Sequence, residues 1–119
     1  MRVILADAHP LFRQGLRDLL EGGSFVEVVG EADNGPDTVT LTEKLVPDAV
    51  VIDINMPGYS GLEATKQIKN LFPDIKVIIL SNSTDRVYAD QALKYGACGY
   101  VLKDNVYDEL ITALGSVKE

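Results

Sequence analysis

Short runs of consecutive apolar residues alternate along the chain with stretches in which apolar residues recur every three or four positions. Consecutive apolar runs are typical of strands buried on both faces of a sheet, whereas the spaced pattern is typical of amphipathic helices. The runs predict five strands, at 3–6, 25–30, 49–52, 76–81 and 99–103. The spaced stretches predict five helices, at 10–20, 36–45, 62–72, 85–95 and 106–117.

This strict alternation predicts the α/β class, with a doubly wound parallel sheet covered by helices on both faces. The run at 25–30 mixes apolar and polar positions, so it is expected near an edge of the sheet. No repeat, linker or low-complexity segment interrupts the pattern, and 119 residues are enough to bury a core. The sequence therefore predicts a single domain over residues 1–119.

Four of the predicted strands end on or just before a polar residue. These residues are Asp7, Asp53, Ser81 and Lys103. Because the carboxyl ends of parallel strands meet at one edge of a sheet, we expect these side chains to share a crevice. Two neighbouring carboxylates repel unless a cation joins them, and Mg²⁺ prefers oxygen ligands such as Asp7, Asp53 and the backbone carbonyl of Asn55.

The hydroxyl and the ammonium at the other two strand ends would complement anionic oxygen. A phosphoryl group attached to a carboxylate, or bound beside it, is one such partner. The simpler alternative is that Lys103 only pairs with Asp53 and that no phosphate is involved.

Composition narrows the classes of partner. The net charge of −7 is opposite to that of a domain that neutralises nucleic-acid phosphates, so we expect no direct contact with nucleic acid. No apolar run approaches the ~20 residues of a membrane span, and no membrane association is expected. The single cysteine, Cys98, cannot form an internal disulfide and fits a reducing cytoplasm, where we expect it to be a small packed residue.

The known enzyme motifs fit poorly, and we expect no turnover enzyme. Phosphatases with an aspartyl nucleophile carry a second acid two residues later, where this chain has Asn55. The segment 58–61 is one residue short of a nucleophile elbow, and no phosphate-binding glycine loop is present. His9 has no serine or cysteine in a matching motif, and we expect it at the start of the first helix.

Four stretches carry a family resemblance: VILADAHPLFRQGLRDLL, VVGEADNG, PDAVVIDINMPGYSGLEATKQIK and GACGYVLKD. Together they resemble, over essentially the whole chain, the receiver domain of bacterial two-component response regulators. The similarity is greatest to the subfamily with a LuxR-type helix-turn-helix output, the NarL/FixJ type. The resemblance implies the flavodoxin-like (βα)5 receiver fold with strand order 2-1-3-4-5.

The resemblance also implies roles for the strand-end residues. The aspartate at the position of Asp53 accepts a phosphoryl group from a histidine kinase in the presence of Mg²⁺. The position of Asp7 belongs to the family's acidic pair, and that of Asn55 gives its backbone carbonyl to the metal. The positions of Ser81 and Lys103 contact the phosphoryl oxygens.

Further expectations concern the switch and the output. Tyr100 matches the aromatic switch residue, which moves inward with the hydroxyl on activation. A DNA-binding domain, if present, would lie beyond Glu119, so that the chain controls transcription without touching DNA. The cognate kinase is the expected partner, and a homodimer is left open.

One departure from the family pattern affects the metal site. The subfamily usually has two acids before His-Pro, but this chain has Asp7 followed by Ala8. Loss of a metal ligand weakens binding by at least the ~10–100-fold typical of a lost outer partner, so weak Mg²⁺ binding is expected. The chain is thus predicted to be a phosphorylation switch on Asp53. The alternative is a degenerate receiver, poorly phosphorylated, that acts as a dimerisation or docking module.

Overall fold

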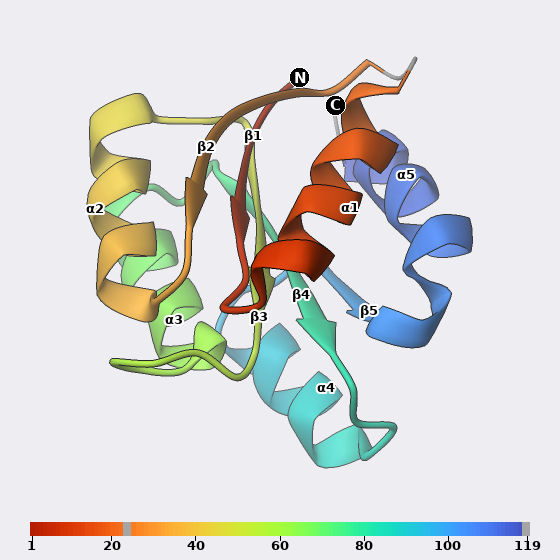
Figure 1. Ribbon diagram of the computed structural model, residues 1–119. Coiled ribbons are helices and arrows are strands. Elements are labelled where there is room, and N and C mark those ends of the chain that lie inside the picture. Colours follow the sequence, from red (N-terminus) through yellow and green to blue (C-terminus); the bar gives the residue numbers. More distant parts are fainter. Residues whose placement is uncertain (23–24, 118–119) are drawn as a thin grey trace.

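The computed structural model, which describes residues 1–22 and 25–117, contains one parallel sheet between two layers of helices (Figure 1). Its strands are β1 (Arg2–Ala6), β2 (Glu27–Ala32), β3 (Ala49–Asp53), β4 (Lys76–Ser81) and β5 (Gly99–Leu102). All neighbouring strands are parallel, in the order β2-β1-β3-β4-β5. This confirms the predicted α/β class, the strand order and the edge position of the second strand.

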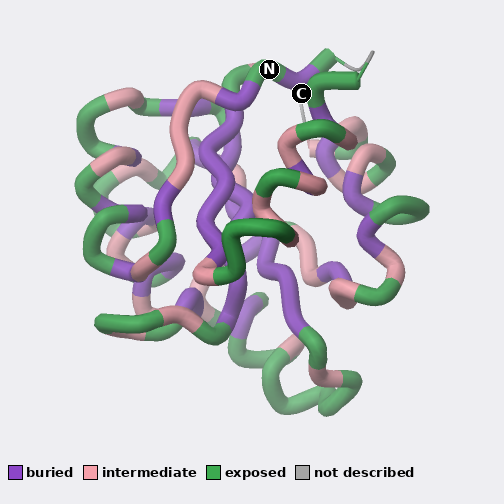
Figure 2. The backbone as a smooth tube through the Cα atoms, in the orientation of Figure 1, coloured by how far each residue is buried: buried purple, intermediate pink, exposed green. Residues whose placement is uncertain are grey.

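The helices are α1 (Pro10–Glu21), α2 (Gly35–Leu45), α3 (Gly61–Leu71), α4 (Arg86–Lys94) and α5 (Val106–Val117). Successive strand residues point to opposite faces, so each strand contributes to two separate cores. Leu5 belongs to the core that contains residues of α1 and α5, whereas Ile4 belongs to the core that contains residues of α2, α3 and α4. The sheet is therefore buried on both sides, as Figure 2 shows for its central strands.

The central strand β3 is buried along its whole length and ends on Asp53. It lies between β1 and β4, so the carboxyl ends of these three strands are adjacent. No helix in the described part of the chain is long and apolar enough to cross a membrane.

The boundaries of the second strand and second helix differ from the prediction. Strand β2 begins at Glu27, two residues later than expected, where the Glu27 N–H donates to the carbonyl of Met1 and extends the pairing with β1. The second helix, predicted over 36–45, begins one residue earlier, at Gly35. Asn34 caps that helix by accepting a hydrogen bond from the N–H of Asp37.

Two further features lie in the segments that flank helices and strands. Cys98 is exposed rather than packed, because it precedes the edge strand β5, although its Sγ lies 3.4 Å from the carbonyl oxygen of Val77. The first helix, predicted over 10–20, ends at Glu21 with Gly22 as its C-terminal cap, and residue 23 lies outside the described residues. At the other end of the sheet, Lys103 follows β5 and begins a short 3₁₀ turn, Lys103–Asn105.

The start of α3 presses against the end of β3. The Gly61 N–H donates to the carbonyl of Ile54, and a Cβ at Gly61 would overlap the backbone carbonyl of Asp53. Gly115, inside α5, has only ordinary contact distances around its missing Cβ. These two helical glycines therefore form a matched pair.

We predict that Gly61→Ala destabilises the domain by about 1–3 kcal/mol, because the helix must move away from the strand end. Gly115→Ala should stabilise it by about 0.5–1 kcal/mol, as is usual for alanine in a helix interior. Urea denaturation of both variants measures this. Equal effects of the two substitutions would show that α3 does not press on β3.

Candidate functional site

Two buried carboxylates lie at adjacent strand ends. Asp7 directly follows β1 and Asp53 ends β3, and both residues are almost inaccessible to solvent. The Asp53 carboxylate also accepts a hydrogen bond from the N–H of Asn55, in the loop that follows the strand. The structure brings Asp7 and Asp53 together at this edge of the sheet.

Lys103 reaches both carboxylates from the end of β5. Its Nζ lies 2.8 Å from Oδ2 of Asp7 and 3.1 Å from Oδ2 of Asp53. The ammonium also lies 4.6 Å from the centre of the Phe12 ring, on α1, in cation–π geometry. The simple pairing of Lys103 with Asp53 is thus present, but it is shared with Asp7.

The shared ammonium leaves the site short of positive charge. Burial raises the pKa of Asp53, and repulsion from Asp7 raises it further. The hydrogen bonds from Lys103 and the Asn55 N–H oppose these effects without outweighing them. Two carboxylates facing one ammonium carry a net charge of −1 when all three groups are ionised.

Ser81 lies at the neighbouring strand end and is also buried. Its Oγ accepts a hydrogen bond from the N–H of Ser83, which leaves the hydroxyl proton free to be donated elsewhere. A cavity of about 270 Å³ opens beside this strand end. It is lined by Ile54, Asn55, Ser81, Asn82, Ser83 and Tyr88.

Tyr100 is connected to the same loop. Its hydroxyl donates to the carbonyl of Ser83, at 3.1 Å, from the middle of β5. Ser83 therefore contacts Ser81 through its N–H and Tyr100 through its carbonyl. A displacement of this loop would therefore alter the hydrogen bonds of both Ser81 and Tyr100.

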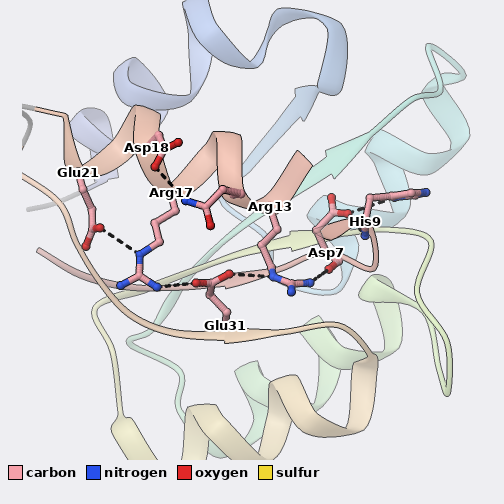
Figure 3. Close-up of polar contacts among 8 residues, drawn as sticks. Asp7, His9, Arg13, Arg17, Asp18, Glu21 and Glu31 are labelled. Carbon is pink, nitrogen blue, oxygen red and sulfur yellow. Dashed lines mark hydrogen bonds and ion pairs between the residues drawn. The ribbon is translucent and has the colours of Figure 1, made fainter. Parts of the chain in front are cut away.

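His9 contacts the site in a way that the sequence did not predict. It precedes α1, as expected, but its backbone N–H donates to Oδ1 of Asp7, and its Nδ1 lies 3.2 Å from the same oxygen (Figure 3). The spacing Asp-x-His before a helix-starting proline is the signal from which this contact could have been anticipated. Ala8, between them, offers no ligand.

Arg13 on α1 also supports Asp7 and was not predicted. Its guanidinium donates to the backbone carbonyl of Asp7 at 2.6 Å and to the carboxylate of Glu31, on β2, at 2.8 Å (Figure 3). Although partial burial of Glu31 acts in the opposite direction, hydrogen bonds from Arg17 and Arg13 lower its pKa. Arg13 thus ties the end of β1 to both α1 and β2.

The site can accept a divalent cation. One ligand atom from each of Asp7, His9 and Asp53 can be chosen so that all lie within 4.8 Å of one another. The buried Oδ2 of Asp7 has no hydrogen-bond partner within the described residues, and its contact with Lys103 is an ion pair. Excess negative charge among buried carboxylates is a condition that a bound cation relieves.

Comparison with known proteins identifies the family of the chain. Residues 3–115 match the response regulator receiver domain family. The chain belongs to this family. It is 40% identical over 119 residues to the transcriptional regulatory protein DegU of Brevibacillus brevis, which covers 100% of this chain and 50% of DegU.

Solved receiver structures have the same fold. A two-component response regulator of the LuxR family from Aurantimonas matches with a TM-score of 0.94 and 33% identity, over 98% of this chain and 84% of that one. The isolated receiver domain of RcsB from Salmonella enterica, solved with the phosphomimetic BeF3⁻, matches with a TM-score of 0.91 and 31% identity, over 99% and 88%. This receiver domain spans about half the length of the curated relatives that it matches.

The burial of Asp53, together with repulsion from Asp7, predicts a pH-dependent gain in stability for Asp53→Asn. Because the folded-state pKa of Asp53 is raised above its ordinary 3.8, the ionised carboxylate destabilises the fold at neutral pH, and this penalty disappears as the pH falls toward 3.8. The variant should therefore melt several degrees higher than the parent at pH 7, equivalent to about 1 kcal/mol, with a difference that shrinks at lower pH.

Thermal melts between pH 4 and 8 measure this difference. Asp90→Asn, at an exposed position of α4, serves as the control and should change stability by less than about 0.5 kcal/mol at every pH. A lower melting temperature for Asp53→Asn at pH 7 would show that the carboxylate is fully compensated.

Proposed function

We propose that this receiver domain is a phosphorylation switch in which Asp53 accepts a phosphoryl group from the phosphohistidine of a sensor kinase. The observation that supports this most directly is the convergence of Asp53, Asp7 and Lys103 at one edge of the sheet, with Ser81 at the next strand end. Response regulators partner with histidine kinases, and the chain itself would be the substrate of the transfer rather than a turnover enzyme.

In this reaction a carboxylate oxygen of Asp53 attacks phosphorus, forming an acyl phosphate as the bond to the imidazole nitrogen breaks. The imidazole leaves and takes up a proton. The Lys103 ammonium is placed to pair with the phosphoryl oxygens, and the Ser81 hydroxyl to donate to one of them. Burial, together with repulsion from Asp7, raises the pKa of Asp53, and the transfer must overcome this unfavourable environment for negative charge.

Receiver domains typically bind Mg²⁺ at an acidic cluster, and the ligands here would be Asp7, Asp53 and the backbone carbonyl of Asn55. When bound, Mg²⁺ supplies positive charge that offsets the phosphoryl oxygens. Since Ala8 provides no carboxylate, we propose that this ion binds weakly and that phosphorylation needs high Mg²⁺ concentrations.

The loop after β4 would transmit the change. A phosphoryl oxygen that takes the Ser81 hydroxyl would compete with the Ser83 N–H for that side chain. Movement of Ser83 would then alter its hydrogen bond to Tyr100 and shift the population of conformations at α4, β5 and α5.

We propose that the full-length protein carries a DNA-binding output domain beyond Glu119. Coverage of about half of each relative, and the name of DegU as a transcriptional regulatory protein, support this. The net charge of −7 fits a regulatory half that does not itself touch DNA. A cytoplasmic location follows from the proposed kinase and DNA partners.

We predict that acetyl phosphate with Mg²⁺ adds the mass of one phosphoryl group to the parent chain and none to Asp53→Asn. In Ala8→Asp, the Mg²⁺ concentration needed for half-maximal incorporation should fall by about 10–100-fold, because the missing carboxylate is restored. Intact-protein mass spectrometry after a fixed incubation measures both effects.

Two outcomes would contradict the proposal. Incorporation that persists in Asp53→Asn would place the acceptor elsewhere. No incorporation in the parent at saturating Mg²⁺, with clear incorporation in Ala8→Asp, would instead identify a degenerate receiver that serves for docking or dimerisation.

A further inference from the structure

We propose that Asp7, His9 and Asp53 form a site for a divalent transition-metal ion such as Zn²⁺, in which the His9 imidazole provides the ligand that Ala8 lacks. The two carboxylates of this metal site also belong to the proposed phosphorylation site. The biological use of the metal site therefore rests on the proposed function, but metal binding does not. Metal binding itself is measured without a phosphoryl donor, so the two proposals fail separately.

The position of His9 is the first observation. Its Nδ1 lies 3.2 Å from Oδ1 of Asp7, and a ligand atom of Asp53 is within 4.8 Å of the other two donors. The side chain is 70% exposed and makes no capping hydrogen bond to α1, so the ring can turn without disturbing the helix. The two carboxylates, in contrast, are buried and fixed at strand ends.

The buried oxygen of Asp7 is an independent observation. The Asp7 side chain is 1% exposed, and its Oδ2 is ion-paired with the Lys103 ammonium at 2.8 Å. Lys103, its ionic neighbour, is shared with Asp53, so one positive charge serves two negative ones. A second cation at this point would balance the charge.

The donor set determines the class of metal. Mg²⁺ prefers carboxylate, carbonyl and water oxygens, whereas imidazole nitrogen suits Zn²⁺ and its transition-metal neighbours. One imidazole and two carboxylates are three protein ligands, and a tetrahedral ion would keep one position for water or an anionic oxygen. Replacement of an acid by Ala8 beside His9 therefore shifts the preference of the site away from Mg²⁺.

The experiment uses tag-free protein with Cys98→Ser as the background, so that the exposed thiol cannot bind the probe. Zn²⁺ and Mg²⁺ are titrated separately by calorimetry and by NMR of the histidine ring. Because His9 is the only histidine in the chain, its ring signals are assigned without ambiguity. The variants are His9→Gln and Asp53→Asn.

We expect Zn²⁺ to shift the His9 ring signals, and His9→Gln to weaken Zn²⁺ binding by at least about tenfold while changing Mg²⁺ binding less than twofold. Asp53→Asn should weaken the binding of both ions and reduce the ring shifts at equal Zn²⁺ concentration. Unchanged Zn²⁺ affinity in His9→Gln would overturn the proposal. The proposal would also be overturned if Asp53→Asn bound Zn²⁺ as tightly as the parent and showed the same shifts of the His9 ring signals. That result would indicate that the exposed histidine binds Zn²⁺ alone.

Discussion

The buried triad of Asp7, Asp53 and Lys103 is the constraint on which the rest of the site depends. Its two carboxylates are held together by adjacent strands, and the single ammonium lies within 3.1 Å of both. Burial makes each charge costly unless it is paired with an opposite charge. One ammonium can neutralise only one of the two carboxylates, so one negative charge remains in excess. Because of this excess negative charge, the site favours the binding of a cation or the covalent modification of a carboxylate.

The fold maintains this arrangement by supporting each member separately. Close contact between Gly61 and the end of β3 fixes the backbone of Asp53, while Arg13 holds the carbonyl of Asp7 against α1 and β2. Lys103 begins the turn after β5, beneath the Phe12 ring. These contacts come from elements far apart in the sequence, so the geometry of the site depends on the folding of the whole domain.

Much of this could be predicted from the sequence because it depends on local patterns. Buried parallel strands are continuous apolar runs in the sequence, and the polar residues at their ends predict that Asp7, Asp53 and Lys103 lie close together. The contacts of Arg13 with Asp7 and Glu31 depend on how α1 lies against the neighbouring strands, which no local pattern specifies. Cys98 looked like a core residue by type, but its place before an edge strand exposes it.

The most direct test of the central claim is a double-mutant cycle between Lys103 and Asp53, measured by urea denaturation at pH 7. If one ammonium serves two buried carboxylates, Lys103→Met alone should cost about 3–5 kcal/mol, and Asp53→Asn in the same chain should recover a large part of that loss. Additive effects of the two substitutions, or a Lys103→Met variant as stable as the parent, would contradict the account.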